Sequence, residues 1–337
     1  MRKIGSVGID IGGTKALFAL LDDRFNVLDE MKEKTRADKD EAHFTDTMAR
    51  AVGELLEKAE KRHLAVGCIG IGCAGSVDEI RQILNESPNI PFLKNYQFSA
   101  RLAKLTDAPV LLTNDVQAGL HGEHRLGAAV GRKHVIGVFL GTGVGGAVIL
   151  DGRRYLGARG HAGDIGHYLL DPLGPLAGSD RHGVLDDVAG RTAIAGAAAS
   201  LAAKQSAPHL LEIAGTDVSR IRSGELAAAI VKGDKGIEDL VRSRARIVGI
   251  ALSNLVDFLN PEMIVLGGGL TDAMPELVRE EVEAGILEHV TPAAREGLEV
   301  AVTKLADHAV TIGAAMLARE RFVAGPVQAD EERSPSA

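Results

Sequence analysis

Aspartates beside glycine-rich turns are the residues whose type and spacing first suggest chemistry. Asp10 ends an apolar run just before the turn Gly12-Gly13-Thr14, and Asp115 follows the apolar run "PVLLT" where a helix begins. A carboxylate at Asp10 suits Mg²⁺ held through water, and a short acid at a strand end suits a general base. Phosphoryl transfer needs little more than these two groups and loops that bind phosphates. The alternative for Asp115 is a purely structural role as the helix N-cap.

A second glycine run, Gly141-Thr142-Gly143-Val144-Gly145-Gly146, matches the pattern GxGxxG, with Asp164 at about the right distance to hold a ribose. In a dinucleotide-binding fold this run must open a helix, so that the pyrophosphate meets the helix N-terminus. Here the short apolar run "AVILDG" follows and ends at Asp151-Gly152, a pair typical of a type I′ hairpin turn. The sequence therefore argues against nicotinamide chemistry.

The first two glycine turns each join two apolar runs, which predicts antiparallel strands on both sides of the turn. A third turn, Gly267-Gly268-Gly269, ends the buried run "EMIVLGGGL". Glycine serves here because backbone N–H groups must approach an anion closely, often at positive φ. Ordinary hairpins are the alternative for each of the first two turns alone. Their matched flanks favour a duplicated fold with one phosphate-contacting loop per half.

Length and composition limit the class of protein. The chain has 337 residues, which favours two domains, and a net charge of −8 without a basic block, which argues against a nucleic-acid partner. Cys68 and Cys73 lie in one apolar run and are expected to be core thiols of a reduced, cytoplasmic protein. We expect no signal peptide and no membrane span.

Hydrophobic patterns predict the elements that position these residues. A helix over 237–259 follows from its apolar stripe, and Asn260-Pro261 ends it. The remaining expectations are a buried strand pair with a glycine turn over 64–78, a helix from Phe98, a strand over 109–113, alanine-rich helices over 186–232 and a disordered tail over 323–337.

Taken together, these motifs resemble the ROK family of sugar kinases and repressors. The similarity covers nearly the whole chain and includes "NDVQAGLHGE" around Asp115, "GARGHAGDIGH" and "NPEMIVLGGGL". It implies an α/β, two-domain actin-like and hexokinase-like ATPase fold, built from duplicated ribonuclease H-like domains around a central cleft. We expect an N-terminal domain of residues 1–118 plus 308–322 and a C-terminal domain of residues 119–307.

The resemblance also implies roles for single residues. Asp115 is the expected base, and Asp10 the expected Mg²⁺ ligand through water. Expected sugar contacts are Asn89, Asn114, Asp115, Asp164, His167 and Asp186. Expected nucleotide contacts are Asp10, Gly12, Gly13, Thr14, Lys15, Gly141, Thr142, Gly143, Gly145, Gly267, Gly268 and Gly269.

Two departures from the family pattern concern the sugar pocket. The family's "ExGH" reads Asp164-Ile165-Gly166-His167, and the glutamate that closes its zinc element reads Asp186. The zinc cysteines are replaced by Ala177, Ser179 and Val184, which leaves His167, with His182 further along the chain, as the nitrogen ligands, so we expect no zinc. Each aspartate side chain reaches about 1.5 Å less far than a glutamate side chain, judged from the residue spacing of an extended chain. The shorter reach weakens the case for glucose as the acceptor.

The predicted function is an ATP-dependent, glucokinase-like sugar kinase that uses MgATP and a hexose-type hydroxyl. The alternatives are a kinase for an N-acetylhexosamine, mannose or fructose type of sugar, and a sugar-binding protein without catalysis. Polyphosphate is the alternative donor, although the intact "VLGGGL" favours ATP. Because only nine residues precede Asp10, we expect no DNA-binding domain. We also expect a homodimer or higher homo-oligomer.

Overall fold

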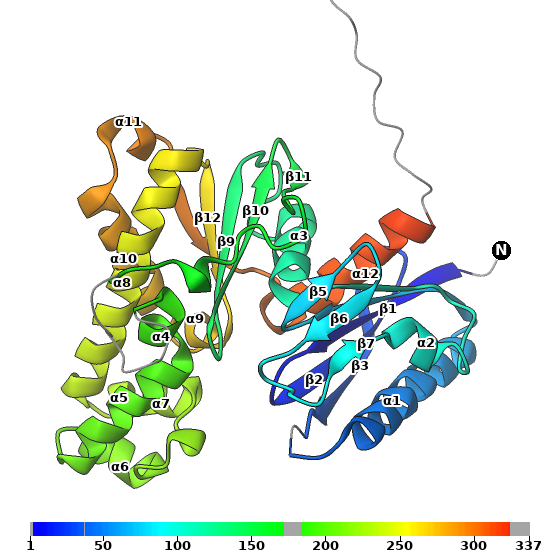
Figure 1. The fold of residues 1–337 in the computed structure, drawn as a ribbon, viewed down its shortest axis with the longest axis horizontal. Coiled ribbons are helices and arrows are strands. Elements are labelled where there is room, and N and C mark those ends of the chain that lie inside the picture. The colour runs from blue at the N-terminus through cyan, green and yellow to red at the C-terminus, as the bar shows by residue number, and fades with distance from the viewer. Residues whose placement is uncertain (1–2, 37, 172–182, 324–337) are drawn as a thin grey trace, which may run out of the picture. The chain divides into compact units, whose positions relative to one another are not determined.

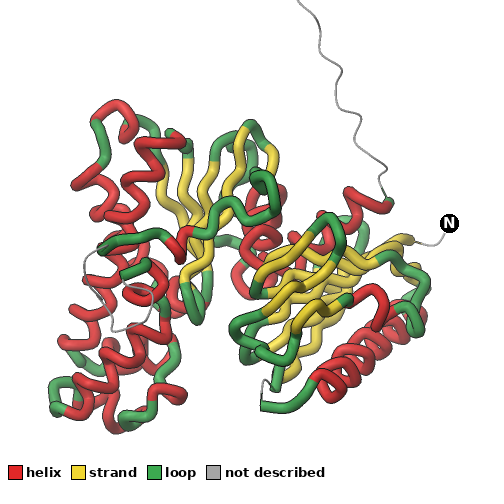
Figure 2. Tube along the Cα trace, viewed as in Figure 1, coloured by secondary structure: helices red, strands yellow, loops and turns green. Residues whose placement is uncertain are grey.

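The computed structural model describes residues 3–36, 38–171 and 183–323 (Figure 1). The chain forms two compact units: unit 1 comprises Met1–Gly122 with His308–Ala337, and unit 2 comprises Glu123–Asp307. Each unit contains a five-stranded sheet, and helices pack against the strands of each sheet (Figure 2). In the part of the chain that the structure describes, every helix is too short or too polar to span a membrane.

The sheet of unit 1 has the strand order β3-β2-β1-β4-β8. β1, β2 and β3 pair antiparallel, whereas β1, β4 and β8 pair parallel. Helices α1 and α12 pack on this sheet. The bounds are β1 (Lys3–Ile11), β2 (Lys15–Leu21), β3 (Val27–Lys34), β4 (Leu64–Cys73), β8 (Val110–Asn114), α1 (Glu41–Lys61) and α12 (Ala309–Phe322).

The two faces of this sheet differ in side-chain size, because side chains alternate along a strand. Val7 and Ile69 belong to a buried core that also contains the apolar stripe of α1. On the other face, a Cβ at Gly8 or Gly70 would overlap backbone atoms of α12. The glycines therefore let α12 lie directly on the strands, and the larger side chains face α1.

The prediction of a strand pair over 64–78 is wrong. β4 continues without a turn to Cys73, and the residues after it form β5 (Ser76–Asp78) in a separate sheet with β6 (Ile83–Glu86) and β7 (Lys94–Tyr96). Gly70 and Gly72 lie within β4 and are packing positions under α12, whereas Gly75 (φ 136°) follows the strand. The helix expected from Phe98 is short, α2 (Phe98–Leu102).

The sheet of unit 2 repeats the plan of unit 1, with the order β11-β10-β9-β12-β13. β9 and β10 pair antiparallel around the second glycine turn, and β9, β12 and β13 pair parallel. Asp151 (φ 51°) and Gly152 (φ 72°) form the predicted hairpin turn between β10 and β11. The bounds are β9 (Val135–Leu140), β10 (Val144–Leu150), β11 (Arg153–Arg154), β12 (Met263–Gly267) and β13 (Glu299–Val302).

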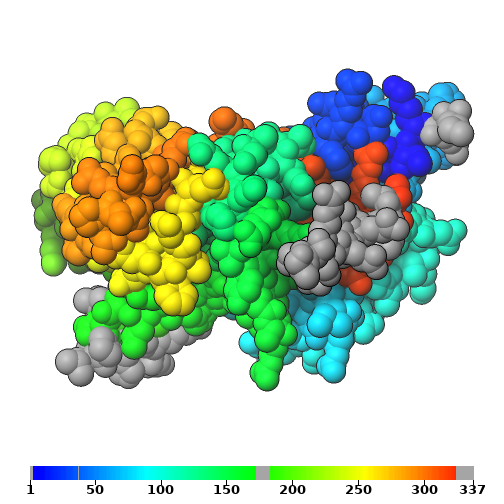
Figure 3. All heavy atoms as spheres, turned by 90° about the horizontal axis from the view of Figure 1, so that it is seen from above, coloured from blue at the N-terminus to red at the C-terminus, as the bar shows by residue number. Residues whose placement is uncertain are grey.

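The helices of unit 2 pack mainly around α8 (Lys235–Leu259), the predicted amphipathic helix, which ends at the left-handed Asn260. α8 and α10 lie side by side (Figure 2), and α11 contacts α8 as well. In Figure 3 the orange atoms of this part of the chain adjoin the yellow ones. The other helices are α4 (Leu185–Ala189), α5 (Arg191–Ala203), α6 (Pro208–Ala214), α7 (Ser223–Val231), α9 (Gly269–Ala273), α10 (Pro275–His289) and α11 (Pro292–Arg295).

The chain passes between the units at two places. Helix α3 (Asp115–Leu126) begins in unit 1 and ends in unit 2, and the chain returns through η3 (Ala306–His308) into α12. The fully buried carboxylate of Glu123 holds these two passages together. It accepts backbone N–H groups from Ala128 (2.7 Å), Lys304 (3.1 Å) and Leu305 (2.8 Å).

Candidate active site

The first glycine turn joins β1 to β2 in unit 1 and is braced by Thr35. The Gly12 N–H donates to the Lys15 carbonyl (3.0 Å), and the Thr35 hydroxyl donates to the Gly12 carbonyl (2.6 Å). The Thr35 N–H donates to the Thr14 carbonyl (3.0 Å). This brace closes the base of the turn, while Thr14 and Lys15 remain exposed at its tip. No local sequence pattern marks Thr35, because it follows a polar strand far from any motif.

Asp10 and Asp115 lie on one edge of the unit 1 sheet. Asp10 is opposite Gly72 in the β1–β4 register, and Cys73 is opposite Asn114 in the β4–β8 register. The carboxyl ends of these parallel strands meet at the same edge, where two strand spacings amount to about 10 Å. A Cβ at Gly72 would lie 3.4 Å from the Asp115 Cα, so the glycine leaves room for Asp115. Burial, and then the Asp115 and Asp10 carboxylates, raise the pKa of the Cys73 thiol.

Asn114 is the residue that caps helix α3. Its Oδ1 accepts the N–H groups of Val116 (3.0 Å) and Gln117 (3.2 Å). The Asp115 carboxylate accepts only the Val116 N–H (3.0 Å) among these donors. Desolvation of its partly buried position raises the pKa of Asp115 to about 6, against the lowering effect of hydrogen bonds from Val116 and Asn114. Asn114 therefore serves as the N-cap of α3, so the cap does not account for the presence of Asp115.

The two asparagines expected to contact sugar lie near these groups. A Cβ at Gly13 would overlap the Asn89 side chain, so Asn89 rests directly against the first glycine turn. The Asn114 Nδ2 donates to the Gly75 carbonyl (3.4 Å) while its oxygen caps α3. Unit 1 thus brings together Asp10, the first glycine turn, Asn89, Asn114 and Asp115.

The second glycine turn, in unit 2, is held by the junction between α4 and α5. The Gly141 N–H donates across the turn to the Gly143 carbonyl (2.8 Å). The N–H groups of Arg191 and Thr192 donate to the carbonyls of Gly141 (3.1 Å) and Thr142 (3.2 Å). These bonds use the first N–H groups of α5, so the helix start fixes the shape of the turn.

Asp186 lies on the other side of the same turn. Its Oδ1 accepts the Val144 N–H at 2.5 Å, and a Cβ at Gly143 would overlap its carboxylate. A Cβ at Gly166 would lie 3.6 Å from the Asp186 Cβ, so the segment that carries Asp164 and His167 packs beside it. The structure therefore gives Asp186 a bracing contact to the glycine turn that its sequence position did not suggest.

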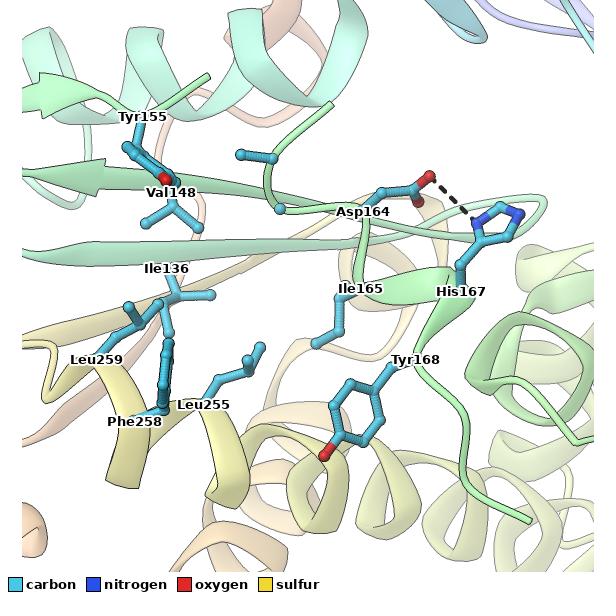
Figure 4. A pocket seen from close by; sticks show the side chains of 12 residues that line it. Ile136, Val148, Tyr155, Asp164, Ile165, His167, Tyr168, Leu255, Phe258 and Leu259 are labelled. Atoms are coloured by element: carbon cyan, nitrogen blue, oxygen red, sulfur yellow. Dashed lines mark ion pairs between the residues drawn. The ribbon is translucent and has the colours of Figure 1, made fainter. Parts of the chain in front are cut away.

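Asp164 and His167 form an exposed pair at η1 (Ile165–His167). The His167 Nδ1 lies 3.2 Å from the Asp164 Oδ2 (Figure 4). In Figure 4 both side chains point away from the apolar side chains on the other side of the segment, among them Ile165 and Tyr168. Those apolar side chains and Phe258 line a pocket of about 400 Å³. Asp164 and His167 are themselves among the residues that line this pocket.

The third glycine turn lies against the second. Gly267 is opposite Phe139 in the β12–β9 register, and a Cβ at Gly268 would lie 2.7 Å from the Leu140 N atom. Gly268 has φ 85°, a left-handed conformation that favours glycine. Since Leu140 directly precedes the second turn, both turns leave the same edge of the unit 2 sheet. Unit 2 thus brings together these two turns, Asp164, His167 and Asp186.

The positions of the lost zinc cysteines are only partly visible. Ala177, Ser179 and His182 lie outside the described residues, and Val184 lies within them. The residues that precede position 172 are joined to those that follow position 182 by two contacts. One is the bridge Leu169↔Val184, and the other is the Leu185 N–H, which donates to the Tyr168 carbonyl (2.9 Å). No group of three or more His, Cys, Asp or Glu side chains within the described ranges could hold a metal ion.

Two glycine turns at equivalent strand junctions, each with a carboxylate nearby, define an α/β protein with the duplicated, hexokinase-like ATPase plan. The chain belongs to the ROK family, whose family model matches residues 6–321.

Comparisons with known proteins identify named kinases of this family. The chain is 28% identical to a glucokinase of Thermotoga maritima, over 96% of this chain and 99% of that protein. It is 27% identical to an N-acetylmannosamine kinase of Salmonella typhi, over 93% and 98%. Among solved structures, a ROK glucokinase from Streptomyces griseus in complex with glucose and AMPPNP has a TM-score of 0.82 and 29% identity, over 94% and 99% of the two chains.

Proposed function

We propose that this chain is an ATP-dependent sugar kinase that transfers the γ-phosphoryl group of MgATP to a hexose hydroxyl. Asp115 is the base in this proposal. The observation that carries it is the position of Asp115, partly buried beside Asp10 at the edge that bears the first glycine turn, with its pKa raised to about 6. The names of the relatives support a carbohydrate kinase in particular.

In the proposed reaction, Asp115 takes the proton of the sugar hydroxyl as its oxygen attacks the γ-phosphorus. The new O–P bond forms as the bond from the γ-phosphorus to the bridging oxygen breaks, and ADP leaves. A carboxylate with a pKa of about 6 is mostly ionised at pH 7 and is more basic than an ordinary aspartate. Asn114 caps the helix, and this leaves the Asp115 carboxylate for the substrate.

Asp10 fits a magnesium ion bound through water, because it is a carboxylate next to a glycine turn and Mg²⁺ favours oxygen ligands and retains waters. When bound, Mg²⁺ would neutralise charge on the donor phosphates. The glycine turns would orient those phosphates through backbone N–H groups.

The acceptor is proposed to be glucose-like, with another hexose or an N-acetylhexosamine as the second candidate. Glucokinases and an N-acetylmannosamine kinase are both similar to this chain over more than nine-tenths of its length, which supports both classes of sugar. Asp164 and His167 present an exposed carboxylate and imidazole suited to bind hydroxyl groups. A ROK protein that binds sugar without catalysis is the competing function.

The test is a coupled assay for ADP release over a panel of hexoses, hexosamines and N-acetylhexosamines, with MgATP as donor and polyphosphate in a parallel series. We expect one or a few sugars to stimulate turnover. Asp115→Asn keeps the shape of the side chain and should lower kcat by roughly 10²–10⁴, the range for loss of a general base. Turnover that survives in the variant would exclude Asp115 as the base. Sugar binding without turnover in the wild type would favour the non-catalytic function.

A further inference from the structure

Arg191 places a cation directly on the second glycine turn. It is the first residue of α5, and its N–H donates to the Gly141 carbonyl (3.1 Å). Its Nη2 donates to the Thr142 hydroxyl (3.3 Å), so the side chain lies along the turn. Thr192 adds two bonds to the Thr142 carbonyl, one from its N–H and one from its hydroxyl, both 3.2 Å. The guanidinium is therefore held at the tip of the turn.

A second arginine lies near the third glycine turn. Arg222 directly precedes α7, and the hydroxyl of the next residue, Ser223, would be 3.8 Å from a Cβ at Gly269. Desolvation lowers the pKa of Arg191, and the charge of Arg222 lowers it further, while Glu225 opposes this effect. Arg222 is thus close enough to Arg191 for the two cations to repel each other.

Within the described residues, neither the Arg191 nor the Arg222 guanidinium forms an ion pair with a carboxylate, and the negative charge that acts on Arg191 is that of Glu225. The Glu225 carboxylate accepts the backbone N–H of Arg222 (3.1 Å). An anion between the two turns would relieve the repulsion, and the planar guanidinium matches phosphate oxygens through two parallel hydrogen bonds.

We propose that Arg191 binds the phosphate chain of the donor, held in place by Thr142, and that Arg222 is a second cation for the same chain. The proposal rests on the proposed function only in that the donor is a phosphate polyanion. ATP and inorganic polyphosphate share this chemistry, and they differ in the adenosine group. Arg191 therefore contributes to the binding of the part that the two donors share.

The experiment measures binding by calorimetry without sugar, so that turnover is not needed. The probes are MgATP, inorganic tripolyphosphate and adenosine, and the variants are Arg191→Gln, Arg191→Lys and Arg222→Gln. Arg220→Gln is the matched control, because Arg220 is an exposed arginine in η2 (Val218–Arg220), two residues before Arg222. Thermal unfolding checks that each variant is folded.

We expect Arg191→Gln to weaken binding of MgATP and tripolyphosphate roughly ten- to hundredfold, the range for a charged hydrogen bond, with adenosine binding unchanged. Arg191→Lys should recover part of the loss, and Arg222→Gln should cause a smaller one. Equal loss for all three probes would show a structural role and overturn the proposal. So would unchanged affinity in Arg191→Gln, or a wild type that binds neither polyanion. A wild type that binds tripolyphosphate but phosphorylates no sugar would refute the proposed function and leave this inference intact.

Discussion

The environment of Asp115 combines two demands on one side chain. Its carboxylate is partly buried, which raises its pKa to about 6, and it sits at the first turn of α3, where Asn114 supplies the cap. A base benefits from this environment because its proton affinity is closer to neutral pH. The folded protein, in contrast, bears the free-energy cost of a poorly solvated charge.

The pH dependence of activity and of stability should therefore have opposite signs at Asp115. We expect kcat/KM to fall with a slope of one as the pH drops through about 6, because the base becomes protonated. For stability, a pKa raised from 3.8 to about 6 means that the folded state binds the proton more tightly than the unfolded chain. This contribution to the free energy of unfolding is complete below about pH 4 and is lost as the pH rises through about 6.

The variant Asp115→Asn has no such titration. Urea unfolding at pH 4 and pH 8 should show that the variant gains stability relative to the wild type at the higher pH, by up to about 3 kcal/mol. The same pH dependence in both proteins would show that Asp115 titrates at its ordinary pKa.

Sugar preference should depend on Asp164 and Asp186. In the double variant Asp164→Glu and Asp186→Glu, each carboxylate extends further, and we expect kcat/KM to shift toward glucose-like acceptors by several-fold to a hundredfold, the effect of about one hydrogen bond to a hydroxyl. Because Asp186 also braces Val144, Asp186→Asn is the control: it keeps an acceptor for the Val144 N–H without added length. An unchanged rank order of sugars in a folded double variant would refute a role in sugar choice.

The sequence predicted the types of residue at the site better than their contacts. The glycine turns, Asp10, Asp115 and the strand-to-helix junction follow from local patterns, and the structure has β1, β8 and α3 at these places. Thr35, Arg191 and the bracing role of Asp186 depend on contacts between distant segments, and no local pattern encodes such pairs. The ROK resemblance, which the family model confirms, supplied the assignment of Asn89.

At the scale of elements, the join between α3 and the returning chain depends on one buried carboxylate. Glu123 accepts three backbone N–H groups, and its removal would leave all three without this acceptor. We expect Glu123→Ala to lower the free energy of unfolding by about 3–5 kcal/mol. Glu123→Gln, which keeps one acceptor oxygen, should cost less, and the exposed Glu57→Ala should cost almost nothing. Chemical denaturation measures all three. A loss below about 1 kcal/mol in the alanine variant would contradict this assignment.

The segment that carries the zinc element in the ROK pattern is joined here by backbone bonds. The bridge Leu169↔Val184 and the bond from the Leu185 N–H to Tyr168 connect its two sides without a metal ligand. We expect purified, tag-free protein to contain less than about 0.1 equivalent of zinc per chain, and chelators to leave its thermal unfolding unchanged, since a structural zinc site contributes directly to folding. One equivalent of zinc by metal analysis would show that other ligands hold the ion.

At the scale of the whole molecule, the two units use the same plan of antiparallel strands around a glycine turn followed by parallel strands. The duplication was predictable because both turns have matched apolar flanks. The wrong prediction of a strand pair over 64–78 was not avoidable from local pattern alone, because a glycine that admits a helix and a glycine that reverses the chain look the same in one sequence.

The return of α12 to unit 1 has a consequence for synthesis on the ribosome. Unit 2 is one continuous stretch of chain, so all of its strands have been translated before α12 is made. The glycine-bearing side of β1 and β4, which α12 covers, stays without its partner for nearly the whole of translation. Domains generally fold as units during synthesis. Unit 1, whose translation begins first, is therefore the last unit to complete its fold. A nascent chain arrested before α12 would expose the backbone of β1 and β4 to chaperones.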